Sequence, residues 1–290
     1  MPIMGATPEA GAGHGGFGPR ARPDRVQLLV TCLIDQFYPG TGMSVVRVLE
    51  RLGLTVEFPA GQTCCGQPAF NAGFLDEARD LARHTIDVLS KSDAPVVIPS
   101  GSCGDMMIHH AAKLLENDPR YGPKATEVAS RTYEFTQFLV DVLGVTDVGA
   151  SIAATAGANA GATAGQSAGP TDTAPPGLVT YHASCHGLRG LGVKAQPAAL
   201  LDHVQGLQRC PLPESEVCCG FGGLFAVKMS EISAAMLGRK LDSIASTNAD
   251  TVVVTDVSCA MHMNGGLHRR GSRARVIHMA DLLAGDASDA

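Results

Sequence analysis

The hydrophobic positions of this chain change their period several times, and each change predicts a different element. Short, continuous apolar runs are typical of buried strands, whereas apolar residues every three or four positions indicate an amphipathic helix. In the first half this pattern predicts strands at Gln27–Leu33, Leu54–Phe58 and Pro95–Pro99, and helices at Met43–Leu52 and Gly73–Ser90. Strands therefore alternate with helices of ten or more residues, which is the pattern of a parallel α/β sheet.

The second half repeats this order of elements. It predicts strands at Leu178–His182, Leu207–Pro211 and Thr251–Thr255, and helices at Gln196–Val204 and Ser230–Ser246. Near the end, the run RVIHMADLL predicts a C-terminal helix that His278 orders. We therefore expect an α/β protein of two pseudo-repeated domains, each built from right-handed βαβ units around a parallel sheet.

Two stretches of the chain lack large apolar residues and divide it into parts. Residues 1–24 are rich in glycine, alanine and proline, and we expect a disordered tail there. Residues 149–177 contain the run SIAATAGANAGATAGQSAGPTDTAPPG, which buries too little surface to order itself and predicts a flexible linker. The two domains are then expected at residues 25–148 and 178–290.

Eight of the nine cysteines form two copies of one spacing. Each half has a Cys-Cys-Gly triplet, with 31 or 32 residues between a lone cysteine and the start of the cysteine pair, and 37 or 39 residues between the end of the pair and another lone cysteine. The first set is Cys32, Cys64, Cys65 and Cys103, and the second set is Cys185, Cys218, Cys219 and Cys259. The ninth cysteine, Cys210, falls in a predicted apolar strand and is expected to be a small core residue.

Most of these cysteines follow the end of a predicted strand. Because the carboxyl ends of parallel strands meet at one edge of a sheet, each set of four thiols is expected to gather in loops at that edge. Gathered thiolates suit iron–sulfur clusters, and four of them also suit a tetrahedral zinc ion, which stays an alternative for the first set. Gly66 and Gly220 would allow a positive φ and a close approach of the backbone to the metal.

Other polar groups near the cysteines are open to more than one interpretation. His182 and His186 flank Cys185, and His262 follows Cys259 by three residues, so each is either a ligand or a neighbour that ligates nothing. Asp35 and Asp256 also lie near cysteines, where we expect solvated loop carboxylates. The GFGG run at 220–223 lacks the spacing of a nucleotide-binding loop.

Composition narrows the classes of function and location. The net charge of −6, the absence of tryptophan and an aromatic content of 4% give no footprint for nucleic acid. The first 25 residues lack the apolar core of a signal peptide, and the longest apolar runs are too short for a transmembrane segment. We therefore expect a cytoplasmic protein, in which reduced cysteines serve metal binding or redox chemistry before disulfides.

Several longer blocks carry a resemblance to a known family. The two cysteine sets resemble the CCG cysteine-rich domain that occurs in heterodisulfide reductase and in the iron–sulfur subunits of glycolate and glycerol-3-phosphate dehydrogenases. More closely, the chain is similar to the family of lactate utilisation protein A over residues 26–284 except the linker. The blocks that carry this similarity are TCLIDQFYP, FPAGQTCCGQPAFNAG, PSGSCGDM, YHASCHGLRGLGVK, CCGFGGLFAVKMSEIS and DVSCAMH.

The resemblance implies a function and partners, and one departure from the family pattern limits the number of thiols at each site. It implies an oxidoreductase subunit that acts with a ferredoxin-type iron–sulfur subunit and a third small subunit to oxidise L-lactate to pyruvate. Met106 and His262 stand where the heterodisulfide reductase pattern has a fifth cysteine, which leaves four thiols per site.

These inferences together predict an iron–sulfur electron-transfer subunit with one or two clusters, of the 4Fe–4S type, held by the eight cysteines. We expect it to be inactive on lactate alone, since the sequence shows no flavin or nicotinamide motif, and no residue is assigned a catalytic role. The alternatives are a thiol–disulfide oxidoreductase of the heterodisulfide type and a zinc-stapled scaffold.

Overall fold

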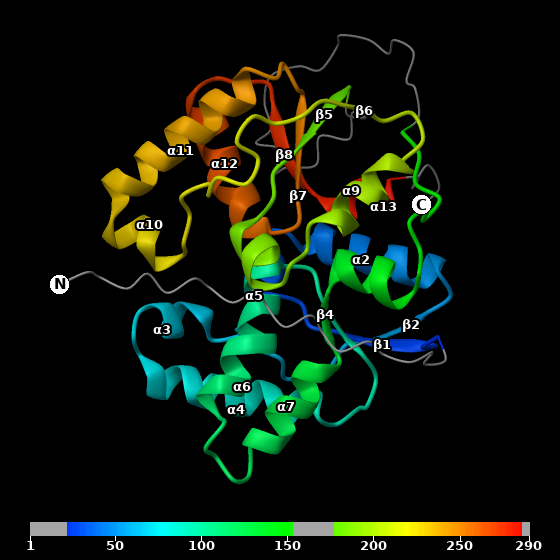
Figure 1. The fold of residues 1–290 in the computed structure, drawn as a ribbon, viewed down its shortest axis with the longest axis vertical. Helices are drawn as coiled ribbons and strands as arrows, with labels where there is room; N and C mark the ends of the chain where they lie inside the picture. Colours follow the sequence, from blue (N-terminus) through cyan, green and yellow to red (C-terminus); the bar gives the residue numbers. More distant parts are fainter. Residues whose placement is uncertain (1–21, 153–176, 286–290) are drawn as a thin grey trace, which may run out of the picture.

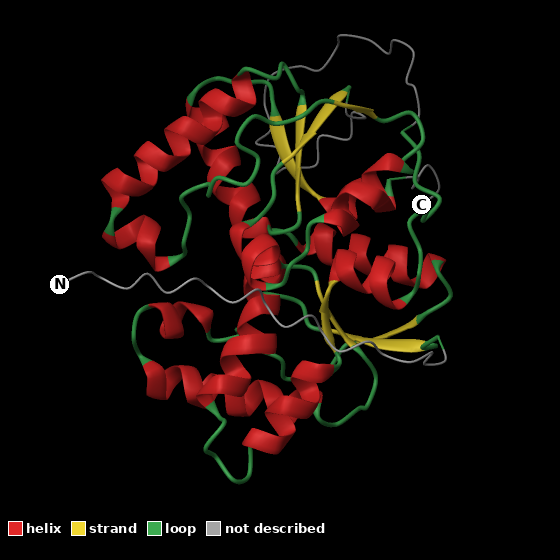
Figure 2. Ribbon diagram, viewed as in Figure 1, coloured by secondary structure: helices red, strands yellow, loops and turns green. Residues whose placement is uncertain are grey.

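A computed structural model describes residues 22–152 and 177–285 of the chain (Figure 1). Most of the predicted N-terminal tail and most of the predicted linker lie outside these residues. Two parallel sheets of four strands each are flanked by helices, as Figure 2 shows. The predicted α/β fold with two pseudo-repeated parallel sheets is therefore confirmed.

The two sheets have the same strand order. The first runs β2-β1-β3-β4 and the second runs β6-β5-β7-β8, and every neighbouring pair is parallel. The strands are β1 (Arg25–Leu28), β2 (Thr55–Glu57), β3 (Val96–Ile98), β4 (Thr132–Glu134), β5 (Leu178–Tyr181), β6 (Gln208–Arg209), β7 (Thr251–Val254) and β8 (Arg275–His278).

The helices cover both faces of each sheet. In the first half they are α1 (Cys32–Phe37), α2 (Pro39–Arg51), α3 (Gln67–Asn71), α4 (Leu75–Leu89), α5 (Gly101–Asp105), the π-helical turn η1 (Met106–His110), α6 (Ala111–Leu114), α7 (Gly122–Ser130), α8 (Phe135–Gln137) and the π-helical turn η2 (Phe138–Val142). In the second half they are the π-helical turn η3 (His186–Gly190), α9 (Ala195–Asp202), α10 (Leu224–Lys228), α11 (Ser230–Ala245), α12 (Val257–Arg269) and α13 (Met279–Ala284).

Elements that the apolar pattern missed are short or start at a proline or a cap. Helix α2 begins four residues earlier than predicted, because Pro39 occupies its first turn, where no backbone N–H is needed. Strands β4 and β8 were not predicted. The run RVIHMADLL divides into strand β8 and helix α13, and the His278 side chain accepts a hydrogen bond from the Ala280 N–H at the start of α13.

The two halves share one hydrophobic core. Helix α13 at the C-terminal end packs on α2 of the first half, and α8 and η2 of the first half pack on α9 of the second. Buried Val45 and Val179, from different halves, belong to the same apolar cluster. In Figure 1, α2, α9 and α13 lie together between the two sheets. Each half therefore completes the core of the other, and together they form one body.

The beginning of the expected linker packs on the second half. Ala150 is 1% exposed and its carbonyl accepts a hydrogen bond from the Gln205 N–H, while the Ile152 N–H donates to the Gln205 carbonyl. Ser151 pairs with Gln205 as an isolated bridge. The rest of the low-complexity run, from residue 153 to 176, lies outside the described residues. Among the residues that are described, no helix is both long enough and apolar enough to cross a bilayer.

Candidate metal centres

The first set of cysteines lies at the carboxyl edge of the first sheet, as predicted. Cys32 opens α1 after β1, and the Thr31 hydroxyl caps this helix by accepting a hydrogen bond from the Ile34 N–H. Cys103 lies in α5 after β3, where the Ser100 hydroxyl accepts from the Cys103 N–H. Only the Cys64-Cys65 pair lies in a loop, so the lone cysteines are held by capped helix starts instead of the expected loops.

These four sulfur atoms approach one another. The Sγ atoms of Cys32 and Cys64 are 3.8 Å apart, and those of Cys65 and Cys103 are 3.4 Å apart. Cys65 and Cys103 are buried, whereas Cys32 and Cys64 are half-buried. Since Cys64 and Cys65 are neighbours in the chain, the four thiols form one continuous group that closes toward the protein interior.

The second set repeats this arrangement. Cys185 precedes η3 after β5, Cys259 lies in the first turn of α12 after β7, and Cys218 and Cys219 lie in a loop. The Sγ atoms of Cys219 and Cys259 are 3.3 Å apart, and both residues are buried. All nine cysteines of the chain are described, and none of them forms a disulfide.

A glycine with positive φ follows each cysteine pair. Gly66 has φ 89° and Gly220 has φ 93°, which is the left-handed region that L side chains rarely adopt. A Cβ on Gly220 would also stand 2.8 Å from the Ser233 carbonyl oxygen. This backbone lets the Gly220 N–H donate to the Cys218 sulfur at 3.3 Å, so the turn supplies a donor to the thiolate.

Contacts among the thiols separate their pKa values. The Cys32 thiol donates to Cys64 and lowers the pKa of Cys64 to about 2, while the same contact raises the pKa of Cys32. Contact with Cys185 likewise lowers the pKa of Cys218 to about 2. The first group therefore holds Cys64 as a thiolate at neutral pH, and the second holds Cys218. Contact with Cys219 also lowers the pKa of Cys259 to about 7, and ionising the remaining thiols is favoured by a cation among them.

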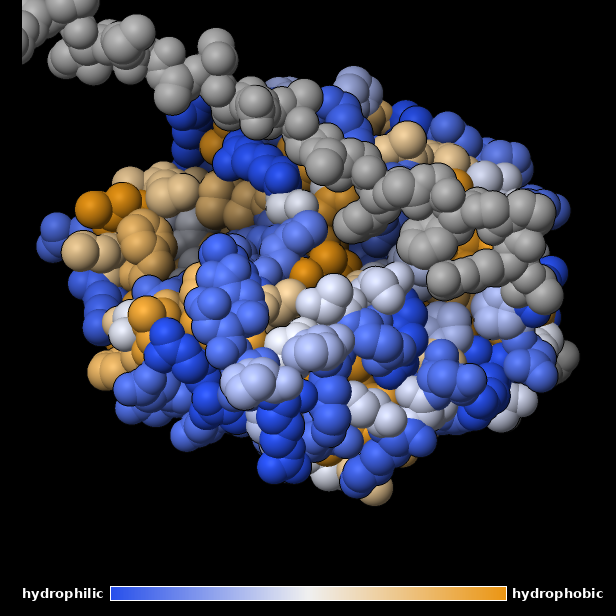
Figure 3. All heavy atoms as spheres, turned by 60° about the horizontal axis from the view of Figure 1, so that its bottom comes forward, coloured by the Kyte–Doolittle hydropathy of each residue, from blue (hydrophilic) through white to orange (hydrophobic). Residues whose placement is uncertain are grey.

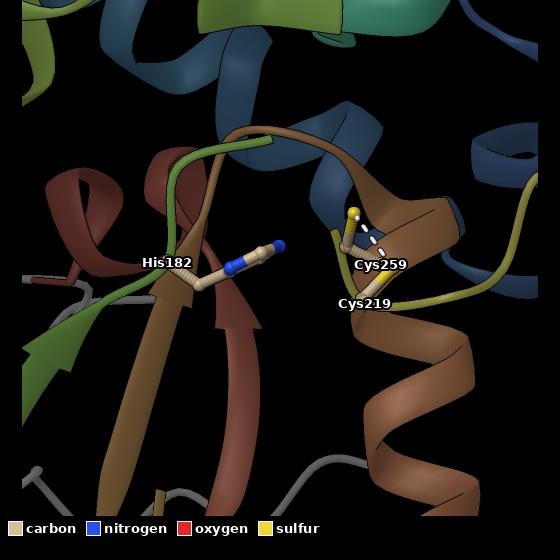
Figure 4. A group of neighbouring side chains, drawn as sticks. All are labelled: His182, Cys219 and Cys259. Atoms are coloured by element: carbon tan, nitrogen blue, oxygen red, sulfur yellow. Dashed lines mark hydrogen bonds between the residues drawn. The ribbon is translucent and has the colours of Figure 1, made fainter. Parts of the chain in front are cut away.

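The three histidines near the second set take different positions. His182 is fully buried at the end of β5, and its ring points toward Cys219 and Cys259 (Figure 4). Its nearer ring nitrogen and these two sulfurs lie within 4.8 Å of one another. His186 Nδ1 lies 3.7 Å from the Cys185 sulfur, and His262 Nε2 lies 3.4 Å from the Ser233 hydroxyl.

The prediction of a solvated carboxylate is wrong for Asp256, although Asp35 is exposed. Asp256 is 2% exposed, because it lies between the two halves of the molecule. Its Oδ2 accepts hydrogen bonds from the Ser102 N–H at 2.8 Å and the Ser100 hydroxyl at 3.1 Å, and its Oδ1 accepts from the Ser258 N–H at 3.0 Å. One carboxylate thus caps the helix of Cys103 and the helix of Cys259.

Cys210 lies outside both groups. It follows the short strand β6 directly and is half-buried, with its sulfur 4.0 Å from the Thr247 carbonyl. Met106, which stands at the fifth-cysteine position of the first half, is fully buried in the same apolar cluster as Cys65 and Cys103. Neither residue adds a polar donor to a cysteine group.

A cavity of about 580 Å³ opens beside the second set of cysteines. It is lined by Asp105, His109, His110, Cys185, His186, Arg189 and Gly190. The second cysteine group is therefore reached from an opening between the halves.

Elsewhere on the surface, apolar side chains gather at the left edge of the view in Figure 3, on the side where α3 and α10 lie in Figure 1.

The donor set of each group fits a metal centre built on soft ligands. Four free thiols of one half meet without a disulfide, two of them are buried, and a glycine N–H faces the thiolate of the second group. Soft, anionic sulfur is the ligand that iron–sulfur clusters and zinc prefer. Hard cations such as magnesium prefer oxygen ligands and would not select this set.

Comparison with known proteins matches both halves. The CCG cysteine-rich domain family matches residues 26–108 and 179–264. Lactate utilization protein A from Bacillus cereus is 42% identical over 259 residues, which cover 89% of this chain and 98% of that protein. Lactate utilization protein A from an Exiguobacterium species is 43% identical over 259 residues, which cover 89% of this chain and 96% of its own.

Solved structures add little to these matches. A glutamate racemase from Bacillus anthracis aligns with 91% of this chain and 80% of its own length, at 9% identity and a TM-score of 0.31. This likeness is too low to support a conclusion on fold or function.

Proposed function

The chain belongs to the lactate utilization protein A family, with two CCG cysteine-rich domains, and we propose that it is the iron–sulfur electron-transfer subunit of a system oxidising L-lactate to pyruvate. The observation that carries this proposal is the paired gathering of eight free thiols into two groups of four. Such groups suit one-electron centres, and the oxidation of lactate releases electrons that such centres pass on.

In this proposal each cysteine set holds one cluster, of the 4Fe–4S type. A cluster so held supplies storage and transfer of single electrons. The protein's own part is to fix the thiolates: the Thr31, Ser100 and Asp256 side chains cap the helices that carry Cys32, Cys103 and Cys259. These caps orient the sulfurs before the metal binds, so less conformational entropy is lost on binding.

Zinc stays the second candidate for the first set alone. Four zinc–sulfur bonds of about 2.3 Å give a tetrahedron with edges of about 3.8 Å. The separations of 3.8 Å and 3.4 Å in the first set are close to this edge. The second set has the buried ring of His182 beside its four thiols, and five donors exceed a tetrahedral site.

The removal of hydrogen from lactate is assigned to the assembled system and not to this chain by itself. Pyruvate formation removes two electrons and two protons, and the sequence shows no motif for a group that accepts the electrons as a pair. We therefore propose a ferredoxin-type iron–sulfur subunit and a third small subunit as partners, in the cytoplasm, where the thiols stay reduced.

Exposed apolar side chains near the cysteine loops offer a surface for such a partner. Val227, Met229 and Ile232 lie on α10 and at the start of α11, and they are 75%, 53% and 55% exposed. Phe74 and Leu75 are exposed at the corresponding place in the first half, before and at the start of α4. Apolar surface of this kind, close to an electron-transfer centre, favours docking of another subunit.

The heterodisulfide type of chemistry is the alternative function. The fifth-cysteine positions of that pattern hold Met106, which packs in the core, and His262, whose ring lies against Phe221 and beside the Ser233 hydroxyl. Neither side chain reproduces a thiolate, which favours the lactate system over disulfide reduction.

Metal and sulfide analysis tests the proposal. Protein purified without oxygen is assayed for iron, acid-labile sulfide and zinc, beside the variant Cys210→Ala. We expect iron with an equal amount of sulfide and a brown colour in both proteins. Zinc without iron or sulfide would reject the electron-transfer function in favour of the scaffold, and zinc together with iron would assign zinc to the first set.

A further inference from the structure

The two centres differ at one position that follows the pseudo-repeat. His182 stands three residues before Cys185, and Leu29 stands three residues before Cys32. Leu29 is 2% exposed and packs in the apolar cluster that contains Cys65 and Cys103. His182 is equally buried and faces Cys219 and Cys259. The same place beside the sulfurs is thus apolar in the first half and holds an imidazole in the second.

The hydrogen bonding of His182 fixes which of its nitrogens carries the proton. Its Nδ1 lies 3.0 Å from the Ser215 carbonyl oxygen. A carbonyl oxygen only accepts, so Nδ1 carries the proton and donates it there. In the neutral ring Nε2 then keeps a free lone pair, which is the form in which histidine binds metals.

The Nε2 atom is fully buried and has no nitrogen or oxygen partner among the described residues, so the Cys259 sulfur is the group left to engage this side of the ring. A buried polar atom without a strong hydrogen-bond partner is destabilising, and such atoms are rare. The sulfurs of Cys219 and Cys259 lie within 4.8 Å of this imidazole, on the side to which the ring points (Figure 4). An occupant among these three atoms would remove the cost.

We propose that His182 Nε2 is a nitrogen ligand of the metal centre in the second half, which makes that centre a mixed nitrogen–sulfur site and leaves the first an all-sulfur site. This inference rests on the proposed iron–sulfur function. The Ser215 carbonyl holds the ring in place and sets its tautomer, as the partners of metal-bound histidines do. His182 therefore supplies the fifth protein donor that the spacing of the cysteines lacks.

The neighbouring histidines provide matched controls. His186 lies beside Cys185 but is only half-buried, and it lines the cavity. The His262 Nε2 is 3.4 Å from the Ser233 hydroxyl, so its ring is already engaged. The variant His182→Asn keeps an N–H near the Nδ1 position for the Ser215 carbonyl and removes Nε2. It separates ligation from the structural role of the ring.

The test is pulsed EPR of the reduced protein, prepared without oxygen with all histidines labelled with nitrogen-15. We expect a coupling from directly bound imidazole nitrogen in the wild-type protein and in His186→Asn and His262→Asn. We expect its loss in His182→Asn. Where that variant also loses the second centre, its iron falls by about half, and the retained coupling in the two controls still assigns the signal to His182.

Two results would overturn the inference, and they are distinguishable. A protein with full iron and sulfide but no imidazole coupling, or with a coupling that persists in His182→Asn, rejects His182 as a ligand and leaves the iron–sulfur function standing. A protein without iron and sulfide rejects the proposed function, and with it this ligand.

Discussion

Sulfur atoms in each half lie as close as 3.3–3.8 Å, a crowding that neutral thiols tolerate and several thiolates do not. The low pKa of Cys64 and of Cys218, about 2 in each case, arises from S–H donors on the adjacent cysteines. As those donors lose their protons, repulsion grows, and only a bound cation offsets it. At the scale of single residues, the chemistry of the groups therefore suits a metal.

The first prediction concerns one buried ligand. Cys219→Ser removes a sulfur that lies 3.3 Å from that of Cys259 and opens the second centre. We expect iron and sulfide to fall by about half, because the first set is untouched. Cys210→Ala, outside both groups, should keep full iron and lose only about 1 kcal/mol of stability to a small cavity. Full iron in Cys219→Ser would exclude that cysteine as a ligand.

The second prediction concerns the buried acid Glu134. Burial raises the pKa of Glu134 to about 7 from 4.5, although the Thr136 hydroxyl and N–H donate to its Oε2. The folded state holds this proton more tightly than the unfolded state. Its stabilising contribution is therefore full below pH 4.5 and is lost as pH rises to about 7, by about 3 kcal/mol.

Glu134→Gln cannot ionise and should not show this loss. Urea unfolding of both proteins between pH 4.5 and 7 measures the effect, and the variant should gain about 3 kcal/mol relative to the wild type over that range. Glu50→Gln on the surface of α2 is the control and should follow the wild type. A difference between Glu134→Gln and wild type that is independent of pH would show that Glu134 is not protonated in the folded protein.

At the scale of elements, two features position the cysteines. They are the capped starts of the helices and one close contact between helices. Helix α5, which carries Cys103, packs against η3, which follows Cys185. The contact is possible because Gly101 and Gly187 face each other without side chains: a Cβ on Gly101 would stand 2.7 Å from the Gly187 nitrogen. The two glycines therefore set the distance between the cysteine-bearing elements.

The third prediction tests that contact. Gly101→Ala would press its methyl group on the Gly187 backbone and on the Ser184 hydroxyl, so we expect a loss of about 1–3 kcal/mol and lower iron content. Gly40→Ala in α2 meets nothing within 4 Å and should be neutral or slightly stabilising. Thermal unfolding and iron assays compare the two. Equal stability and equal iron content in the two variants would show that α5 and η3 are not tightly packed in solution.

The fourth prediction concerns the apolar surface of α10 and α11. Val227→Asp places a charge on a side chain that is 75% exposed, so the fold and iron content should not change. Affinity for the iron–sulfur partner subunit, measured by calorimetry, should fall at least tenfold. Met43→Asp on α2, which is 53% exposed, should bind as the wild type does. An unchanged affinity in Val227→Asp would place the partner on another surface.

The sequence predicted the elements that bury clear apolar runs, and it missed two strands and one burial that depends on the other half. Continuous apolar runs identified β1, β3, β5 and β7, and cysteine spacing identified which thiols meet. Asp256 was misjudged, since its burial arises only when α5 and α12 from different halves converge on it. Strands β4 and β8 were missed because each runs directly into a helix, α8 or α13, so the apolar pattern shows no boundary between strand and helix.

The whole molecule is a pair of similar halves with unequal centres. Helix α13 packs on α2 and helix α9 on α8, so the two halves share one apolar cluster beside the clusters of their own. Across this shared core, the first centre lies beside Leu29 and the second beside His182 and the cavity lined by Cys185. If each cysteine group holds a one-electron centre, as we propose, two different centres in one protein would suit the receipt of electrons at one side and their release at another.

The most direct test of this account is lactate-dependent reduction of an electron acceptor by the reconstituted protein, without oxygen, with and without its partners. We expect no reduction by this chain alone and rapid reduction once the ferredoxin-type subunit and the third subunit are added. In that mixture, Cys219→Ser should fail and Cys210→Ala should work. Rapid lactate-dependent reduction by this chain alone, or activity on a disulfide without activity on lactate, would contradict the assignment as an electron-transfer subunit.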